Sequence, residues 1–230
     1  MLKSKELRAK AWESLKGKYW KAFAVVLVLG LLISIGTSMV TCSQNMMNIV
    51  NSVDPAEMDS TAAVGALVIS VSALIICLIG AVISLLVGDP ASVGLCNYFI
   101  KNTDSNPSFG EAFSGFKVKY GRNIGTLLLM GIKLTLWHLL FIIPGIIKTF
   151  EYAIIPYILA DDAEITSKEA FKKAKQMMKG NKWRLFKLDF SFIGWYVLCI
   201  FTLGLGTFFL LPYVEAAMAE FYVELKNSNN

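Results

Sequence analysis

Six ionisable side chains lie inside segments that are otherwise strongly apolar, and these are the residues best placed to do chemistry. They are Lys133, His138, Glu151, Asp189, Glu215 and Glu220. A charge at the centre of a bilayer costs about 2.5 to 3.5 kcal/mol on insertion scales, so it needs a partner or water. If the apolar segments cross a membrane, the six side chains form a candidate intramembrane polar site.

Lys133 and Glu215 are predicted to lie at the same depth, since each is about eleven residues from the expected outer turn of its hairpin. They form either a structural ion pair between hairpins or a polar pocket or path, in which Lys133 holds an anionic headgroup or a peptide carboxylate. His138 and Glu151 are level on the two arms of one hairpin. Either the two side chains form a simple hydrogen bond, or they take part in a proton relay.

Asp189 and Glu220 are predicted to be level near the inner surface, where they can be simple interfacial groups. The chain has one histidine and no H-E-x-x-H, P-loop or G-x-S-x-G motif, which argues against a zinc protease and offers no catalytic constellation. Its four cysteines are read as buried small residues rather than a disulfide or metal site. We therefore expect no catalytic residue, metal, cofactor or enzymatic activity. A lipid-modifying enzyme that uses Asp189, Glu215 or His138 is the weakest alternative.

The segments that carry these side chains are long enough to cross a membrane. The chain has 230 residues, of which 55% are hydrophobic and 17% charged, and its mean hydropathy is +0.56. Soluble domains usually contain about 25% charged residues. Residues 22–53 and 62–88 contain no charge, whereas a spanning helix needs only ~20 predominantly apolar residues. We predict an integral membrane protein.

Six membrane spans are predicted, and the basic residues set their orientation. The spans are 20–41, 62–88, 124–143, 145–160, 184–203 and 206–225. Lysine and arginine gather in residues 1–21, 89–123 and 161–187, whereas the loop 42–61 and the short turns at 144–145 and 203–206 contain none. Because basic loops stay on the cytoplasmic side, both termini are predicted to be cytoplasmic. Gly88-Asp89-Pro90 is expected to bend or end the second span.

A repeated phrase introduces the hairpins. Residues 4–23, SKELRAKAWESLKGKYWKAF, align without gaps with 167–186, SKEAFKKAKQMMKGNKWRLF, and nine of twenty positions are identical. Residues 108–127, SFGEAFSGFKVKYGRNIGTL, are a looser copy. The pattern predicts an all-α polytopic membrane bundle, in which three hairpins are each preceded by a cytoplasmic amphipathic helix. The chain is then a single membrane domain, residues 1–230, with repeat units of about 4–101, 108–160 and 166–226.

Each copy is predicted to start as a helix on the inner leaflet, with lysines toward anionic headgroups. In the last copy the apolar stripe consists of Ala170, Phe171, Ala174, Met177 and Met178. The spacing Ser108-x-x-Glu111 and Thr166-x-x-Glu169 predicts two capping boxes. Gly17, Gly121 and Gly180 are expected to end the three helices, because glycine tolerates left-handed backbone geometry.

The chain then enters the membrane through residues suited to headgroup depth. These interfacial residues are Lys16, Lys18, Trp20, Lys179, Lys182, Trp183 and Arg184. Tryptophan favours this depth because its ring is apolar and its N–H is polar. Since the basic helices alternate with aromatic residues that face the bilayer, no nucleic-acid partner is expected.

Several motifs resemble a bacterial integral membrane family. They are YILADD (157–162), KGNKWRLFKLDFSFIGW (179–195), TLGLG (202–206), LPY (211–213) and FY (221–222). The family is domain of unknown function nine hundred and seventy-five, and the resemblance implies a multi-span protein of the bacterial cytoplasmic membrane with no assigned activity. The expected arrangement of hairpins and surface helices also resembles, more distantly, the membrane portion of some glycerophosphodiester phosphodiesterases. This resemblance implies a function that involves lipids.

The sequence thus favours a non-enzymatic membrane protein that engages lipids or amphipathic peptides at the inner leaflet and organises partner proteins. Its partners are then anionic headgroups, peptides and other membrane proteins. The alternative is a small transporter or exporter whose polar site is Lys133 and Glu215.

Overall fold

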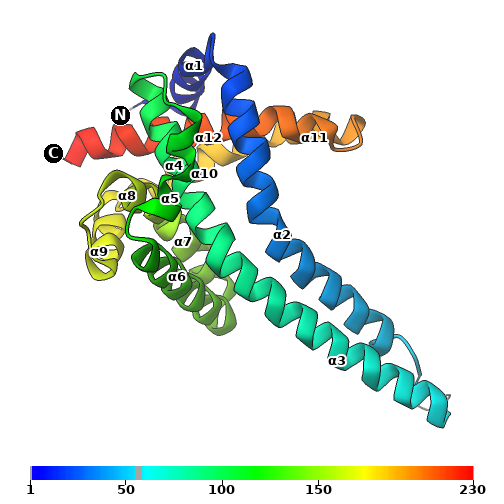
Figure 1. Ribbon diagram of the computed structural model, residues 1–230. Helices are drawn as coiled ribbons and strands as arrows, with labels where there is room; N and C mark the ends of the chain where they lie inside the picture. The colour runs from blue at the N-terminus through cyan, green and yellow to red at the C-terminus, as the bar shows by residue number, and fades with distance from the viewer. Residues whose placement is uncertain (1, 55–58, 230) are drawn as a thin grey trace. The chain divides into compact units, whose positions relative to one another are not determined.

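The computed structural model describes residues 2–54 and 59–229, and all regular structure in these ranges is helical (Figure 1). Its elements are α1 (Ser4–Leu15), α2 (Tyr19–Asn51), α3 (Ser60–Ile83), the π-helical turn η2 (Ser84–Gly88), α4 (Asp89–Asp104), the 3-10 helix η3 (Phe109–Phe113), α5 (Ser114–Lys117), α6 (Tyr120–Leu140), α7 (Ile142–Tyr152), α8 (Ile155–Asp161), α9 (Ser167–Met177), α10 (Lys182–Phe190), α11 (Ile193–Phe201) and α12 (Leu205–Asn229). The prediction of an all-α protein is confirmed for the described residues.

The chain divides into two compact units. The first contains Met1–Leu29 and Pro90–Asn230, and the second contains Gly30–Asp89. In the second unit α2 and α3 run side by side (Figure 1), and small residues allow their backbones to come close. A Cβ on Gly36 would lie 2.2 Å from the Ser84 Oγ, and one on Gly80 would lie 2.8 Å from the Met39 Cβ. Larger side chains would therefore push the two helices apart.

Among the residues that the structure describes, four helical stretches are long and apolar enough to cross a membrane. They are Tyr19–Asn51, Ser60–Asp104, Tyr120–Leu140 and Ile142–Asp161. They correspond to the first four predicted spans, although α2 continues through much of the predicted loop 42–61. These four helices support the prediction that the chain is a membrane protein.

The last two predicted spans are not confirmed in the part of the chain that the structure describes. Residues 184–203 contain most of α10 and all of α11, helices of nine residues each, separated by a turn at Ser191 and Phe192. Helix α12 has 25 residues and contains Pro212, but it does not reach the hydropathy of the four apolar stretches. The arrangement of six spans in three hairpins remains a prediction.

The second span does not end at Gly88-Asp89-Pro90, because the helix continues through this segment, and the expected bend there stays a prediction. Ser60–Asp104 forms one helical stretch of 45 residues. A π-helical turn precedes the proline, in which the backbone N–H of Asp89 donates to the Ser84 carbonyl five residues earlier. This wider turn accommodates Pro90, which has no N–H of its own to donate.

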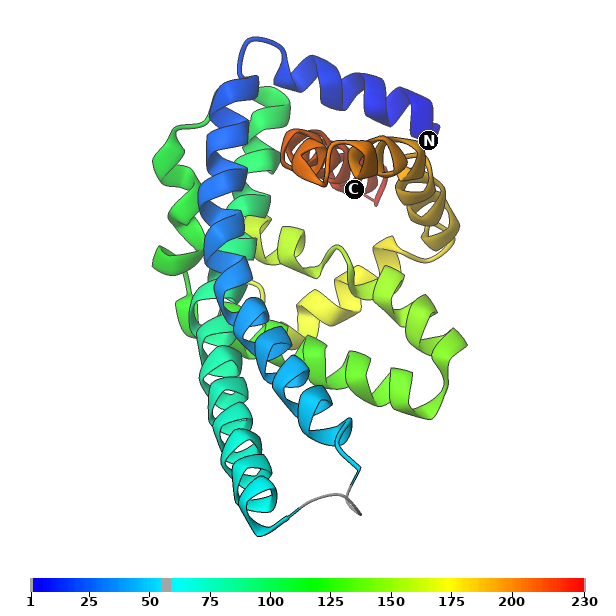
Figure 2. The same ribbon diagram turned by 90° about the vertical axis from the view of Figure 1, so that its right-hand side faces the viewer.

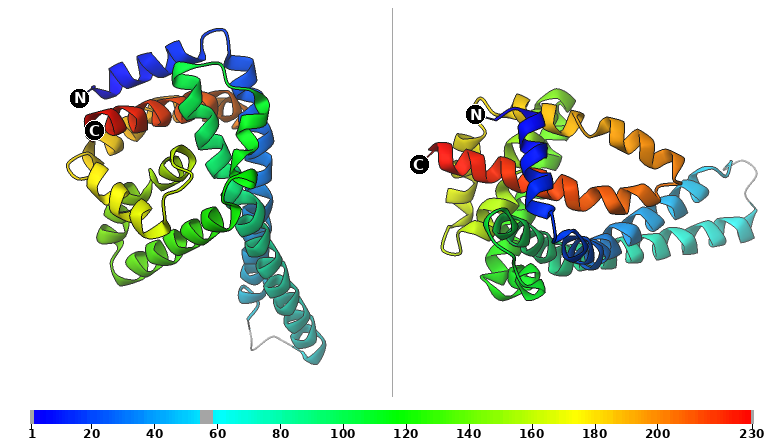
Figure 3. Two further views of the ribbon diagram at one scale, coloured as in Figure 1. Left: turned by 60° about the vertical axis from the view of Figure 1, so that its left-hand side comes forward. Right: turned by 90° about the horizontal axis from the view of Figure 1, so that it is seen from above.

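In the first unit α1 packs on α12, and the view from above in Figure 3 shows that it crosses this helix. The apolar side of α1, made of Leu7, Ala11 and Leu15, is buried. The Tyr213 hydroxyl donates to the Arg8 carbonyl at 3.2 Å. The two chain ends meet, because the Leu2 N–H donates to the Glu224 Oε1 at 2.7 Å.

Helix α9 also buries its apolar side in the protein. Ala170 and Ala174 are completely buried, and Phe171 meets the Tyr152 ring edge-on with 5.2 Å between centroids. The helix packs on α7, α8 and α12. The predicted stripe is thus part of the core, and only the lysine side of α9 remains for a membrane surface.

Two of the three predicted glycine elbows form. Gly17 has φ +75° and Gly180 has φ +79°, each between two helices, where a side chain would strain the backbone. Gly121 instead lies inside α6. In that copy the left-handed residue is Lys119, with φ 46°, at the start of α6. The similarity of the first and last copies therefore extends to local geometry, while the threefold repeat remains a prediction.

Of the two outer turns, one is displaced. The turn at 203–206 forms where expected, with Leu203 at φ 52° and Gly204 at φ +86°. In the preceding hairpin α6 ends at Leu140, and the extended Phe141 makes the turn. Pro144 and Gly145, predicted to turn, lie in the first turn of α7, so the prediction of a turn at 144–145 is wrong by about one helical turn.

Candidate functional site

The predicted Lys133–Glu215 pair does not form. The Lys133 Nζ lies 3.6 Å from the centroid of the Phe171 ring, a cation–π contact with α9. Glu215 accepts a hydrogen bond from the Tyr157 hydroxyl at 3.2 Å. The reason is the displaced turn. Lys133 lies eight residues before Phe141, whereas Glu215 lies eleven after Gly204, so the two are no longer level.

The predicted contact between His138 and Glu151 does not form either. The His138 Nδ1 lies 2.8 Å from the Leu134 carbonyl oxygen, and the ring packs so closely on Gly145 that a Cβ there would lie 2.7 Å from it. Glu151, only 3% exposed, instead accepts from the Lys148 Nζ at 2.6 Å and from the Lys182 Nζ. Asp189 is exposed on α10, and Glu220 is half-buried on α12. The six candidates therefore do not meet in one site.

Three of the predicted interfacial side chains have partners inside the protein. Lys182 binds Glu151. Arg184 pairs with Glu224 at 2.8 Å, and the Lys18 Nζ donates to the Ser105 carbonyl at 2.6 Å, at the end of α4. Lys16 and Lys179 are exposed. Trp20 and Trp183 are 71% and 62% exposed, as expected for interfacial anchors.

The segments YILADD and FY, which carry the family resemblance, lie against each other. The rings of Tyr157 and Tyr222 stack with 5.7 Å between centroids. Asp161 accepts from the Tyr222 hydroxyl at 2.9 Å and from the Lys226 Nζ at 2.7 Å. This cluster ties the end of α8 to α12 next to the largest polar cavity described below.

Arg122 fixes the loop between α8 and α9. Its guanidinium donates to the carbonyls of Leu159, Asp162, Ala163 and Ile165 at 2.8 to 3.2 Å. The planar fork of an arginine suits this convergence of acceptors, which a lysine cannot reproduce. Sequence reasoning missed this role, because the acceptors are main-chain carbonyls and leave no trace in side-chain spacing.

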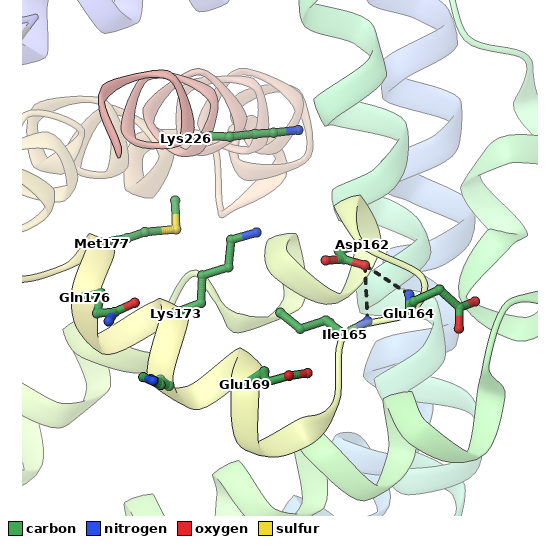
Figure 4. Close-up of a pocket in the computed structure, with 9 residues that line it drawn as sticks. Asp162, Glu164, Ile165, Glu169, Lys173, Gln176, Met177 and Lys226 are labelled. Carbon is green, nitrogen blue, oxygen red and sulfur yellow. Dashed lines mark hydrogen bonds between the residues drawn. The ribbon is translucent and has the colours of Figure 1, made fainter. Parts of the chain in front are cut away.

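A polar cavity of about 790 Å³ lies between this loop, α9 and α12 (Figure 4). Its lining residues are Asp162, Glu164, Ile165, Glu169, Lys172, Lys173, Gln176, Met177 and Lys226. The side chains of Lys173 and Lys226 extend into the same space toward Asp162 (Figure 4). No residue of this lining was predicted as a site. The available signal was Asp162 followed by a capping threonine, which is typical of a tight, hydrogen-bonded loop.

The acidic residues of the cavity differ in how their oxygens are used. The Asp162 Oδ1 accepts from the N–H groups of Glu164 and Ile165 at 3.0 and 3.1 Å. Glu164 pairs with Lys119 at 3.2 Å. Glu169 caps α9 with Thr166, and the hydrogen bonds from the Thr166 backbone and hydroxyl lower the pKa of the Glu169 carboxyl. In the described ranges, no group of three or more His, Cys, Asp or Glu residues could hold a metal ion.

The outer side of α9 is a row of lysines, which we call the lysine face. It consists of Lys168, Lys172, Lys175 and Lys179. All four are exposed, and the ion pairs found among residues 2–54 and 59–229 include none of them. These ammonium groups are therefore available to an external anion.

Comparison with known proteins gives one match. Residues 139–229 match the model of a family described as Protein of unknown function (DUF975). Neither the comparison with curated proteins nor the comparison with solved structures found a match. The cavity and the lysine face both lie within the matched residues. The C-terminal part of this chain is thus similar to the DUF975 family.

Proposed function

We propose that this chain is a non-enzymatic, multi-pass protein of the bacterial cytoplasmic membrane that engages anionic lipid headgroups at the inner leaflet. The observation that carries the proposal is the lysine face of α9, whose four lysines form no ion pair with the described side chains. Each basic residue near an anionic leaflet contributes about 1 kcal/mol of attraction. Because the apolar side of α9 is buried in the protein, this contact is electrostatic and weakens as salt screens it.

In the proposed topology the six predicted spans form three hairpins, with both termini in the cytoplasm. The third hairpin consists of α10 and α11 on one arm and α12 on the other, joined at Leu203 and Gly204. It is supported by the packing of α11 on α12, which Figure 2 shows. The lysine face then lies on the same side of the membrane as α1, which carries its own lysines.

Amphipathic peptides are a second class of ligand in the same proposal, and an aromatic groove supports them. The groove has a volume of about 540 Å³ and lies between α1, α11 and α12. Its aromatic lining is Trp12, Tyr19, Trp195, Phe209 and Tyr213. Bulky aromatic side chains supply the contact area that an apolar peptide side chain needs. Partner proteins would dock through such peptides.

The test removes two lysines of the face that do not line the cavity. Purified Lys168→Gln/Lys175→Gln protein should lose about thirtyfold in its preference for phosphatidylglycerol over phosphatidylcholine, since two charges contribute about 2 kcal/mol. The measurement is lipid retention in native mass spectrometry. The matched control is Lys101→Gln/Lys119→Gln, whose lysines already pair with Glu111 and Glu164. Equal lipid preference in both double variants would refute the proposal.

The alternative of a small transporter or exporter has less support. Its proposed site at Lys133 and Glu215 lacks the ion pair expected between them. The Glu151 carboxylate is occupied within the protein, because it binds both Lys148 and Lys182.

A further inference from the structure

We propose that the polar cavity between α9, α12 and the loop 162–166 binds a zwitterionic group made of one phosphate and one primary ammonium. Phosphoethanolamine, either as a lipid headgroup or free, is the ligand of this class. The proposal deepens the proposed function, on which it rests for the side of the membrane that the cavity faces. It assigns the binding to Asp162, Lys173 and Lys226, none of which belongs to the lysine face, although Lys172 borders both, and it names a different lipid.

The phosphate side of the cavity is formed by lysines that have donors to spare. Lys173 lines the cavity and forms no ion pair with any described residue. Lys226 donates to the Asp161 Oδ1 at 2.7 Å, and an ammonium group has three N–H donors. Both side chains point into the same space (Figure 4). A phosphate between them would accept charge-assisted hydrogen bonds from two helices.

The ammonium side is formed by Asp162. Both hydrogen bonds that its carboxylate accepts, from Glu164 and Ile165, go to Oδ1, and Oδ2 has no hydrogen bond among residues 2–54 and 59–229. The turn therefore fixes the carboxylate while leaving one oxygen for an external donor. The other two acidic residues of the cavity are engaged, Glu164 with Lys119 and Glu169 with Thr166. Asp162 is thus the acidic residue of the lining that neither pairs with a lysine nor caps a helix, and it lines the same cavity as Lys173 and Lys226.

The lining also argues for a primary amine over a quaternary one. Proteins recognise quaternary ammonium groups with cages of aromatic rings, whereas the lining contains no aromatic residue. A carboxylate oxygen needs an N–H donor, which ethanolamine has and choline lacks. A purely anionic headgroup would meet the lysines but be repelled by Asp162. The combination selects phosphoethanolamine over phosphocholine and phosphoglycerol.

The experiment compares lipids on the full-length protein in detergent. Native mass spectrometry would measure retention of phosphatidylethanolamine, phosphatidylcholine and phosphatidylglycerol at equal concentrations. We expect phosphatidylethanolamine to be retained about tenfold better than phosphatidylcholine, the effect of one charge-assisted hydrogen bond. A second arm measures the thermal shift produced by free O-phosphoethanolamine. A rise in melting temperature with O-phosphoethanolamine would show that the cavity binds the free headgroup. Retention of phosphatidylethanolamine without such a rise would show that the cavity binds the lipid only.

Two variants and a control decide the residue assignments. Asp162→Asn keeps Oδ1 as an acceptor for the turn but removes the charge, so the preference for phosphatidylethanolamine should disappear. Lys173→Gln should weaken retention of this lipid about tenfold, while Lys175→Gln, on the same helix but outside the cavity, should not. Unchanged phosphatidylethanolamine retention in both cavity variants overturns the inference. That result would leave the proposed function standing, since it depends on Lys168 and Lys175.

Discussion

At the scale of single residues, the strongest electrostatic feature is the carboxylate of Glu151. It is buried at the junction of α7 and α10 and binds two lysines, Lys148 and Lys182, from the two helices. A buried carboxylate without a partner is costly, so both lysines are held in place by the need to neutralise it. The cluster therefore joins two helices that are separate in sequence.

Replacement of Glu151 by glutamine should lower the free energy of unfolding by about 3 kcal/mol, because it leaves two partly buried lysines facing each other without a counter-charge. Lys182→Gln should cost only about 1 kcal/mol, since Lys148 still neutralises the carboxylate and the Lys182 side chain is 31% exposed. Unfolding in mixed detergent micelles measures both. Equal losses in the two variants would contradict this account.

The charged residues themselves could be chosen from the sequence, but their partners could not. Depth was counted from the expected outer turns, and this works only where the turn is placed correctly. The third hairpin turns at Leu203 and Gly204, as predicted. In the second hairpin the turn moved to Phe141, which shifted Lys133 and His138 relative to Glu215 and Glu151. The predicted position of this turn was wrong by about one helical turn, and neither the Lys133–Glu215 pair nor the His138–Glu151 contact forms.

At the scale of elements, two capping sequences of the same spacing behave differently. Before α9, Thr166 and Glu169 form the reciprocal capping box. Before η3, the Ser108 side chain makes no capping hydrogen bond, because the Glu111 N–H donates to the Ser108 carbonyl instead, and the Glu111 carboxylate pairs with Lys101 of α4 at 2.8 Å. The first sequence begins an α-helix of 11 residues, and the second begins a 3-10 helix of five. Tertiary contact decides which box closes.

Thr166→Ala should therefore destabilise the protein by about 1 kcal/mol, the usual cost of a lost N-cap, whereas Ser108→Ala should change stability little. Hydrogen exchange of the first turn of α9 would report the difference. Acid gives a second check. The pKa of Glu169 is lowered by its hydrogen bonds with Thr166. This stabilisation is complete above the ordinary glutamate pKa, about 4.3, and disappears as pH falls through the lowered value. The protection of the first turn of α9 against hydrogen exchange should therefore decrease at acid pH. If it decreases equally in Thr166→Ala, the capping box is not the cause.

Local patterns predicted α9 well because several signals agreed there. The cap, the apolar stripe and Gly180 all mark the same helix. What the stripe touches could not be read from the sequence, since a bilayer and a protein core favour the same side chains. Gly121 shows the opposite case. Its place after the middle copy suggested a helix end, yet the chain turns at Lys119 and Gly121 continues α6.

At the scale of the whole molecule, the orientation in the membrane follows from where the basic residues lie. We predict that Ser52, which directly follows α2, faces the outside of the cell and that Lys175 faces the cytoplasm. Ser52→Cys and Lys175→Cys would each be made with the four native cysteines changed to serine. A membrane-impermeant maleimide should label the first in intact cells and the second only after permeabilisation. Labelling at 175 in intact cells would exclude the proposed topology.

The native cysteines must be removed because they are not all buried. The sequence had suggested that all four are. Cys96 and Cys199 are buried, but Cys42 is exposed on α2. An apolar run alone cannot distinguish a core position from one that faces lipid. The same ambiguity explains why the positions of the first four apolar helices could be predicted better than the partners of their side chains.

The contact between α1 and α12 has a consequence for the order of synthesis. The Leu2 backbone and the Glu224 carboxylate, which bind each other, are among the first and the last of these residues to leave the ribosome. Until α12 has been synthesised, the buried side of α1 lacks the helix on which it mainly packs. The native contact therefore forms only after α12 has left the ribosome, although α1 is made long before it.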